Sequence, residues 1–337
     1  MKLSTRVERL QLRHTFTIAR SSEDVVPVVI AQVEERGLTG IGEASPSRYY
    51  NEDVETVERA LQGLQGWLET QHSAIFSHVL DEAAERLGPA RGALSALDLA
   101  LHDWFGKRLG EPLHALLGLD PSRTPLTSFT IGIDTIEKMI EKLRQAHEMP
   151  IIKVKLGTRD DLGILRALRA ETSAVFRVDA NCAWTPAETI EKSRELKALG
   201  VEFIEQPLPA DQLDAMEEVR AKSALPLIAD ESSVVADDVP RLRGRFHGIN
   251  IKLVKCGGIA PALRMIRLAR AQGMKVMIGC MIESSVACTA AAQIAPLVDY
   301  LDIDGPLLIT NDPYRGVEYD RGQLRLPAGP GLGVTKR

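Results

Sequence analysis

The fold is decided by residues 151–304, which open with Ile151-Ile152-Lys153-Val154-Lys155. Further short apolar runs follow this one, and each ends on a charged side chain. They lie at residues 176–179, 201–205, 227–230, 249–252 and 300–304. The final charges of the first five runs are 24, 26, 25 and 22 residues apart, which is the length of a strand, a helix and two loops. Charges at the C-terminal ends of successive parallel strands are typical of the active site of an α/β barrel.

Strands and helices are predicted to alternate through this region. We predict eight strands, at residues 127–133, 151–155, 175–179, 201–205, 226–230, 248–252, 275–279 and 300–304. The intervening helices are predicted at residues 136–147, 160–171, 186–199, 211–221, 236–243, 260–272 and 284–296. This order and count predict an α/β fold, a (β/α)8-type (TIM-like) barrel. No long helix is predicted after the eighth strand.

The first part of the chain has a different pattern. Strands are predicted at residues 25–33 and 38–44, polar loops at 17–24 and 45–51, and helices at 52–71, 75–87 and 93–108. We therefore predict an α+β capping domain at residues 1–115 and the barrel at 116–313. A Gly- and Pro-rich C-terminal segment, residues 314–337, is predicted to return to the cap.

Composition excludes several classes of partner. The chain has 337 residues and a formal net charge of −5, without a basic stripe, so nucleic acid is not an expected partner. No apolar run reaches the ~18 residues of a membrane span, and no signal-peptide core is present. The four cysteines have neither CxxC nor zinc-site spacing, as is typical of reduced thiols. We expect a cytoplasmic protein without a membrane partner, assembled as a homo-oligomer.

Three acidic residues end three neighbouring strands of the predicted barrel. Asp179, Glu205 and Asp230 would repel one another strongly unless a cation lay among them. Oxygen ligands without nearby His or Cys favour a hard divalent ion, Mg²⁺ ahead of Mn²⁺ or Ca²⁺. Asn181 and Glu231 are weaker candidates for the surroundings of the ion.

Lysines are predicted on two opposite strands. Lys153 and Lys155 are two residues apart and so share one face of their strand. Neighbouring ammonium groups and a metal ion are expected to lower a lysine pKa toward that of a general base. Lys252 ends the sixth strand, across the barrel from the second, so a carbon held between Lys155 and Lys252 would face one amine on each side. Lys255 is a competing candidate for the second base.

Together these groups predict a reaction class. Opposed lysines beside a divalent ion indicate proton abstraction α to a carboxylate, through an enediolate that the ion stabilises. Asp302 and Asp304 share one face of the last strand. A pair of carboxylates there suits a cationic group of the substrate, such as an ammonium.

The motifs in combination resemble the muconate-lactonising subgroup of the enolase superfamily. They are Lys153-x-Lys155, Asp179-Ala180-Asn181, Glu205-Gln206-Pro207, Ala229-Asp230-Glu231-Ser232 and Asn250-Ile251-Lys252 followed by Gly257-Gly258. Within that subgroup, Asp302-Ile303-Asp304 and Met281-Ile282-Glu283-Ser284 resemble the dipeptide epimerases.

The resemblance implies a role for each candidate residue. Mg²⁺ would lie on the three strand-end acids, Lys155 and Lys252 would be the acid/base pair, and Lys153 would polarise the enolate. Asp302 and Asp304 would hold the α-ammonium of a dipeptide. Arg20 would meet an acidic substrate side chain. The remaining predicted substrate contacts are Thr130, Met281 and Glu283.

The expected function is epimerisation of a dipeptide at the α carbon of its C-terminal residue, with L-Ala-L/D-Glu the leading substrate. The same site also suits an N-acyl amino acid racemase, an o-succinylbenzoate synthase or a muconate cycloisomerase. Those substrates are anionic and have no ammonium, so Asp302 and Asp304 would disfavour them. A non-catalytic metal-binding barrel is a further alternative, which the presence of both lysines and all three acids weakens.

Overall fold

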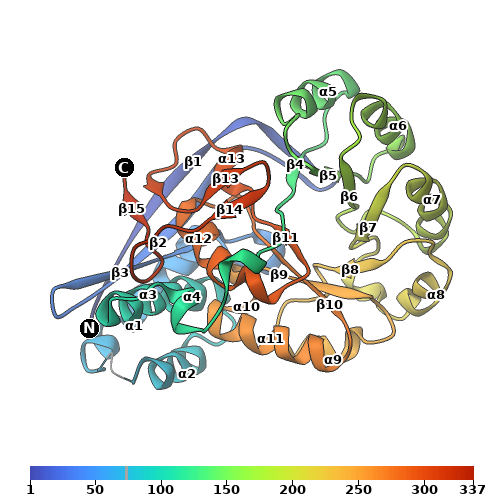
Figure 1. Ribbon diagram of the computed structural model, residues 1–337. Coiled ribbons are helices and arrows are strands. Elements are labelled where there is room, and N and C mark those ends of the chain that lie inside the picture. The colour runs from blue at the N-terminus through green and yellow to red at the C-terminus, as the bar shows by residue number, and fades with distance from the viewer. Residues whose placement is uncertain (73–74) are drawn as a thin grey trace.

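An antiparallel sheet and three helices form the N-terminal part of the computed structural model, which describes residues 1–72 and 75–337 (Figure 1). Its strands are β1 (Lys2–Ile18), β2 (Ser21–Glu35) and β3 (Leu38–Ala44), paired in that order. Its helices are α1 (Val54–Glu69), α2 (Phe76–Leu87) and α3 (Arg91–Leu109), followed by the short α4 (Leu113–Leu116). This α+β arrangement agrees with the predicted capping domain.

Helix α3 lies directly on strand β3 because two glycines leave room for it. A Cβ at Gly40 would lie 2.0 Å from the carbonyl oxygen of Ala100, and one at Gly42 would lie 2.1 Å from that of Ala96. Only glycine permits so close an approach of two backbones. The long helix in turn is buried along most of its length, between the sheet and the barrel.

Eight parallel strands form the barrel, and they are bonded in chain order. They are β4 (Phe129–Ile131), β5 (Ile151–Lys155), β6 (Val175–Asp179), β7 (Val201–Glu205), β8 (Leu227–Ala229), β9 (Gly248–Ile251), β10 (Lys275–Gly279) and β11 (Tyr300–Asp302). A parallel bridge between Thr127 and Leu301 joins the last strand to the segment before the first. The predicted barrel is therefore confirmed.

Helices surround the sheet on its outer face (Figure 1). They are α5 (Ile136–Gln145), α6 (Asp161–Glu171), α7 (Pro186–Ala198), α8 (Ala215–Lys222), α9 (Val239–Leu242), α10 (Leu253–Cys256), α11 (Ile259–Ala271) and α12 (Ser285–Ile294). Only the short α13 (Gly305–Leu308) follows the eighth strand. Among the described residues, no helix has both the length and the apolar character needed to cross a membrane.

The prediction of a loop at residues 17–24 is wrong. Strands β1 and β2 continue through this region and leave only Ala19 and Arg20 as the turn between them. The polar side chains stabilise the hairpin, since the hydroxyl groups of Thr17 and Ser22 are 2.8 Å apart on paired residues. Both faces of this arm are largely exposed, so its polar composition resembled that of a loop.

The C-terminal segment contains four short strands, β12 (Tyr314–Arg315), β13 (Glu318–Asp320), β14 (Gln323–Arg325) and β15 (Thr335–Lys336). Strand β12 pairs with β15, and β13 pairs with β14. The end of this segment contacts α3, where Leu332 N donates to Asp103 Oδ1 at 2.8 Å.

Two buried carboxylates join the capping domain to the barrel. Asp98 of α3 accepts hydrogen bonds from Ile259 N at 2.6 Å and Ala260 N at 3.3 Å, at the start of α11. Glu43 of β3 accepts from Ser284 N at 2.8 Å, at the start of α12. The oxygens of both side chains accept from free N–H groups at a helix N-terminus, and each contact therefore fixes the position of the cap.

We expect Asp98→Ala to destabilise the protein by about 1–3 kcal/mol, because it leaves buried N–H groups of α11 without an acceptor. The midpoint of urea denaturation measures this change. Asp120→Ala removes an exposed cap that accepts from Ser122 N at 2.9 Å, and it should cost clearly less. Equal effects of the two substitutions would contradict a role for Asp98 in the junction.

Candidate active site

Strand register brings the predicted acidic residues together. Asp179 of β6 is paired with Glu205 of β7, and Asp230 directly follows β8. All three side chains are buried, and one carboxylate oxygen from each lies within 4.8 Å of those of the other two. Parallel strands of similar length end at one edge of the barrel, which is why charges about 25 residues apart in sequence meet in space.

These three carboxylates suit a divalent cation. Burial, and repulsion from Asp179, raise the pKa of Glu205 to about 7. A cation among the three groups would favour the ionised form of each. The ligand set is all oxygen, as Mg²⁺ prefers. The residues present therefore fit this ion.

Lys155 and Lys252 approach the acids from opposite sides of the barrel. Lys155 Nζ lies 2.7 Å from Asp179 Oδ2, and Lys252 Nζ lies 2.9 Å from Asp230 Oδ2. Both lysines are buried. The structure thus places one amine at each end of the row of acids, as predicted from the strand positions.

The predicted fall in lysine pKa concerns Lys153 and Lys155 beside a metal ion, and for Lys153 the neighbouring carboxylates act in the opposite direction. Burial lowers the pKa of Lys252, but the charge of Asp230 outweighs it and holds this pKa above its usual range. The pKa of Lys153 is also raised, since Asp302 and Glu205 outweigh its burial. The prediction considered the neighbouring ammonium groups and an ion, whereas each of these lysines contacts a carboxylate directly.

Lys255 occupies a different environment from Lys252. Its Nζ lies within hydrogen-bonding distance of four oxygens: Asp230 Oδ1 at 2.5 Å, Asp230 O at 2.6 Å, Ser233 O at 3.0 Å and Asn250 O at 3.3 Å. An ammonium has three protons to donate, so all of them are engaged. This side chain is suited to holding Asp230 in place.

Asp302 and Asp304 lie beside Lys153 and Thr130. Asp302 Oδ2 is 2.6 Å from Lys153 Nζ, and Asp304 Oδ2 accepts from Thr130 N at 2.6 Å. Burial raises the pKa of Asp302, yet Lys153 outweighs it and holds the value at about 2. Burial, and then repulsion from Asp302, raise the pKa of Asp304 to about 7. A cationic substrate group would relieve that repulsion.

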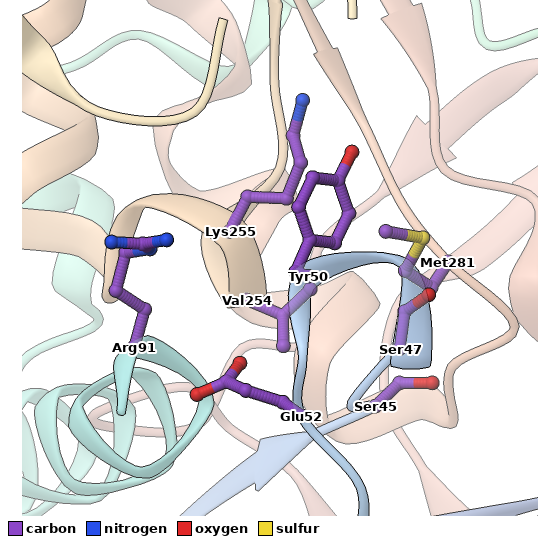
Figure 2. A pocket seen from close by; sticks show the side chains of 8 residues that line it. All are labelled: Ser45, Ser47, Tyr50, Glu52, Arg91, Val254, Lys255 and Met281. Atoms are coloured by element: carbon purple, nitrogen blue, oxygen red, sulfur yellow. The ribbon is translucent and has the colours of Figure 1, made fainter. Parts of the chain in front are cut away.

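The capping domain contributes to the mouth of the site (Figure 2). A cavity is lined there by Ser45, Ser47, Tyr50 and Glu52 from the segment after β3, Arg91 of α3, Val254 and Lys255 of α10, and Met281. Met281 Sδ lies 3.7 Å from Lys252 Nζ, so this predicted substrate contact is next to the candidate base. The predicted loop at residues 45–51 includes a short helical turn, Arg48–Tyr50.

Arg20, at the turn between β1 and β2, reaches the rim of the barrel. Its Nη2 lies 2.7 Å from Glu231 Oε1, and its Nη1 donates to Asn181 O at 3.2 Å. The guanidinium also lies 4.4 Å from the ring centre of Tyr49. The prediction that Arg20 is near the site is consistent with this position, but its charge already has a partner.

Glu283 is placed differently from the other predicted contacts. It is buried near Glu43 at the junction with the capping domain, and it does not line the cavity of Figure 2. Burial, and repulsion from Glu43, raise its pKa to about 8.

Two residues that support the acids had no predicted role. Asn250 Nδ2 donates to Glu205 Oε1 at 2.7 Å, and Gln206 Oε1 accepts from Asp230 N at 2.9 Å. Gln206 has a φ of 31° and Asn181 a φ of 45°, a left-handed conformation that is uncommon outside glycine. In the sequence the two residues stood out only as members of motifs, Gln206 in Glu205-Gln206-Pro207 and Asn250 in Asn250-Ile251-Lys252.

Comparison with known families gives a consistent result. Residues 2–118 match the N-terminal domain of mandelate racemase / muconate lactonizing enzyme, and residues 135–337 match the enolase C-terminal domain-like family. The chain therefore belongs to the enolase C-terminal domain-like family. The two matched regions correspond to the capping domain and to most of the barrel with the C-terminal segment.

Individual relatives cover the whole chain. An L-Ala-D/L-amino acid epimerase of Maribacter sp. is 44% identical over 340 residues, which cover 99% of each chain. An L-Ala-D/L-Glu epimerase of Bacteroides thetaiotaomicron is 42% identical and covers 100% of this chain and 88% of its own. A dipeptide epimerase of Methylococcus capsulatus, crystallised with Mg and L-Arg-D-Lys, is 35% identical with a TM-score of 0.91 and covers 99% of each chain.

We expect Glu205→Gln to weaken Mg²⁺ binding at least about tenfold, because it removes a buried anionic ligand. Isothermal titration calorimetry with Mg²⁺ alone measures this affinity. Glu202→Gln, which breaks a 2.8 Å ion pair with Arg177 near the start of the same strand, is the matched control. Unchanged affinity in Glu205→Gln would exclude this residue as a ligand.

Glu43 should make the metal-free protein less stable as the pH rises. Burial raises its pKa from the usual 4.5 to about 7, although hydrogen bonds from Ser284 oppose the shift. The folded state therefore holds this proton more tightly, so the stabilisation is complete below about pH 4.5 and is lost as the pH rises through about 7. We expect Glu43→Gln to flatten the dependence of the urea midpoint between these values, whereas Glu55→Gln, at an exposed position, should leave the slope unchanged.

Proposed function

We propose that this protein is a Mg²⁺-dependent dipeptide epimerase that inverts the α carbon of the C-terminal residue. The observation that carries the proposal is the placement of Lys155 and Lys252 at opposite ends of one row of buried carboxylates. A substrate carboxylate bound over that row would have its α carbon between the two amines. One amine can then remove a proton from one face while the other ammonium donates a proton to the opposite face.

The cation would be held by Asp179, Glu205 and Asp230, and it would supply electrostatic stabilisation of the charge that develops on the substrate carboxylate. Lys153 adds a fixed positive charge beside the same row, 2.8 Å from Glu205 Oε2 and 3.4 Å from Asp179 Oδ2. Both contributions would stabilise the negative charge that develops when the α proton is removed.

Lys252 is better placed than Lys255 to be the second base. Within the described part of the chain, its amine has one carboxylate, that of Asp230, and the sulfur of Met281 within hydrogen-bonding distance, and Met281 lines the mouth. The amine of Lys255 is instead surrounded by four oxygens. A base must be able to release its proton and reach the substrate, and Lys255 is constrained in both respects.

Asp302 and Asp304 support a dipeptide as the substrate. They lie at the strand adjoining the Lys153 side of the site, where a free α-ammonium would find two carboxylates. The substrates of an N-acyl amino acid racemase, an o-succinylbenzoate synthase or a muconate cycloisomerase lack that ammonium. The names of the relatives from Maribacter and Bacteroides support L-Ala as the first residue.

Deuterium incorporation tests the proposal directly. With Mg²⁺ and L-Ala-L-amino acid dipeptides in D₂O, we expect a gain of one mass unit and formation of the second epimer. Lys155→Ala and Lys252→Ala should each lower epimerisation by about 10²–10⁴-fold, since each removes one acid/base group. Because one base remains in each variant, residual exchange should be confined to one epimer. The two variants should differ in which epimer that is.

Lys275→Ala is the control, because Lys275 is exposed at the start of β10 and pairs with Asp299. It should leave exchange unchanged. Exchange with N-succinyl amino acids but with no dipeptide would contradict the dipeptide assignment. Retained epimerisation in Lys252→Ala, together with its loss in Lys255→Ala, would overturn the choice of second base.

A further inference from the structure

Arg20 and Glu231 form an ion pair at the edge of the active site that the proposed chemistry does not use. Glu231 directly follows the candidate ligand Asp230, and its side chain has an exposed fraction of 0%. Among residues 1–72 and 75–337, Arg20 is the only cation within 4.0 Å of its carboxylate. The two residues come from different domains, since Arg20 lies at the tip of the β1–β2 hairpin.

The hairpin brings Arg20 across the barrel. In Figure 1 the β1–β2 arm extends from the capping domain toward β5 and β6. Two contacts fix it there: Ile133 N donates to Thr17 O at 2.8 Å, and Arg20 Nη1 donates to Asn181 O, just after β6. The Arg20–Glu231 pair therefore lies over the ends of β6 and β8.

The proposed substrate pose directs one group toward this pair. In this pose Lys155 and Lys252 face opposite sides of the α carbon. The carboxylate of the substrate lies over the row of acids, and its peptide nitrogen lies on the side of Asp302. The remaining substituent is the side chain of the C-terminal residue. It points away from β11, and β7 lies opposite β11 in the eight-stranded barrel, flanked by β6 and β8.

Arg20 is a neutralised rather than an available cation. One edge of its guanidinium meets Glu231, another donates to a carbonyl, and one face lies on the ring of Tyr49. To bind an acidic substrate side chain, Arg20 would have to leave Glu231. A buried carboxylate without a counter-ion is strongly unfavourable, so the exchange of one carboxylate for another would bring little or no net gain.

We propose that Glu231 determines side-chain specificity by neutralising Arg20, so that the site selects dipeptides whose C-terminal residue is uncharged. This inference rests on the proposed function and refines its substrate class. It replaces the expectation from sequence that Arg20 binds an acidic side chain. An unpaired Arg20 would favour acidic residues, and an unpaired Glu231 would favour basic ones.

The test compares kcat/KM of the Mg²⁺-loaded enzyme for L-Ala-L-Leu, L-Ala-L-Glu and L-Ala-L-Lys. The wild type should favour Leu over both charged residues. Glu231→Gln should raise the Glu/Leu ratio about tenfold or more. The guanidinium of Arg20 would then be free to form a charge-assisted hydrogen bond with the acidic side chain of the substrate. Arg20→Met should instead raise the Lys/Leu ratio. Ratios cancel any general loss of activity that a substitution beside Asp230 causes.

Two controls make the result specific. In the Arg20→Met background, Glu231→Gln should no longer raise the Glu/Leu ratio, because the cation is gone. Glu202→Gln breaks an Arg–Glu pair away from the site and should change no ratio.

Three outcomes would overturn the inference. The first is a wild type that favours Glu and loses that preference in Arg20→Met, which would make Arg20 the ligand of the acidic side chain. The second is unchanged ratios in both single variants. Epimerisation of no dipeptide by the wild type would instead overturn the proposed function, and this inference with it.

Discussion

The site depends on burying several negative charges in a small volume. Asp179, Glu205 and Asp230 each bring one carboxylate oxygen within 4.8 Å of the others, with almost no contact to water. Such charges are stable only beside positive ones. Lysines from β5, together with Lys252 and Lys255, surround the row and provide that balance. The same amines that allow the acids to be buried are those placed to move a proton, so charge balance and chemistry are not separable here.

The barrel could be predicted from sequence because strand length and spacing are local properties. Four predicted strands, at 151–155, 175–179, 201–205 and 275–279, have the observed bounds. Their register then places Asp179 beside Glu205 and Lys155 beside Asp179 without further assumptions. The candidate acids and lysines followed from these facts and from the motifs of a known family.

What the sequence could not provide were the partners that each charge meets. The contact between Lys153 and Asp302 joins residues 149 positions apart, and the contact between Arg20 and Glu231 joins two domains. Neither is encoded by spacing within a strand. The raised pKa of Lys252 has the same origin, since it depends on a 2.9 Å contact with Asp230. The hairpin at residues 17–24 was also missed, because its polar side chains face solvent on both sides.

The segment after β3 has a consequence for how such an enzyme can change. Residues 45–52 line the mouth but lie between β3 and α1, whose buried side chains pack within the capping domain. Substitutions there alter the shape of the entrance and leave the acidic residues and lysines of the barrel strands unchanged. New substrate preferences can therefore arise by mutation without an inactive intermediate, and a library randomised at Ser45, Ser47 and Tyr50 should sample selectivity at nearly constant chemistry.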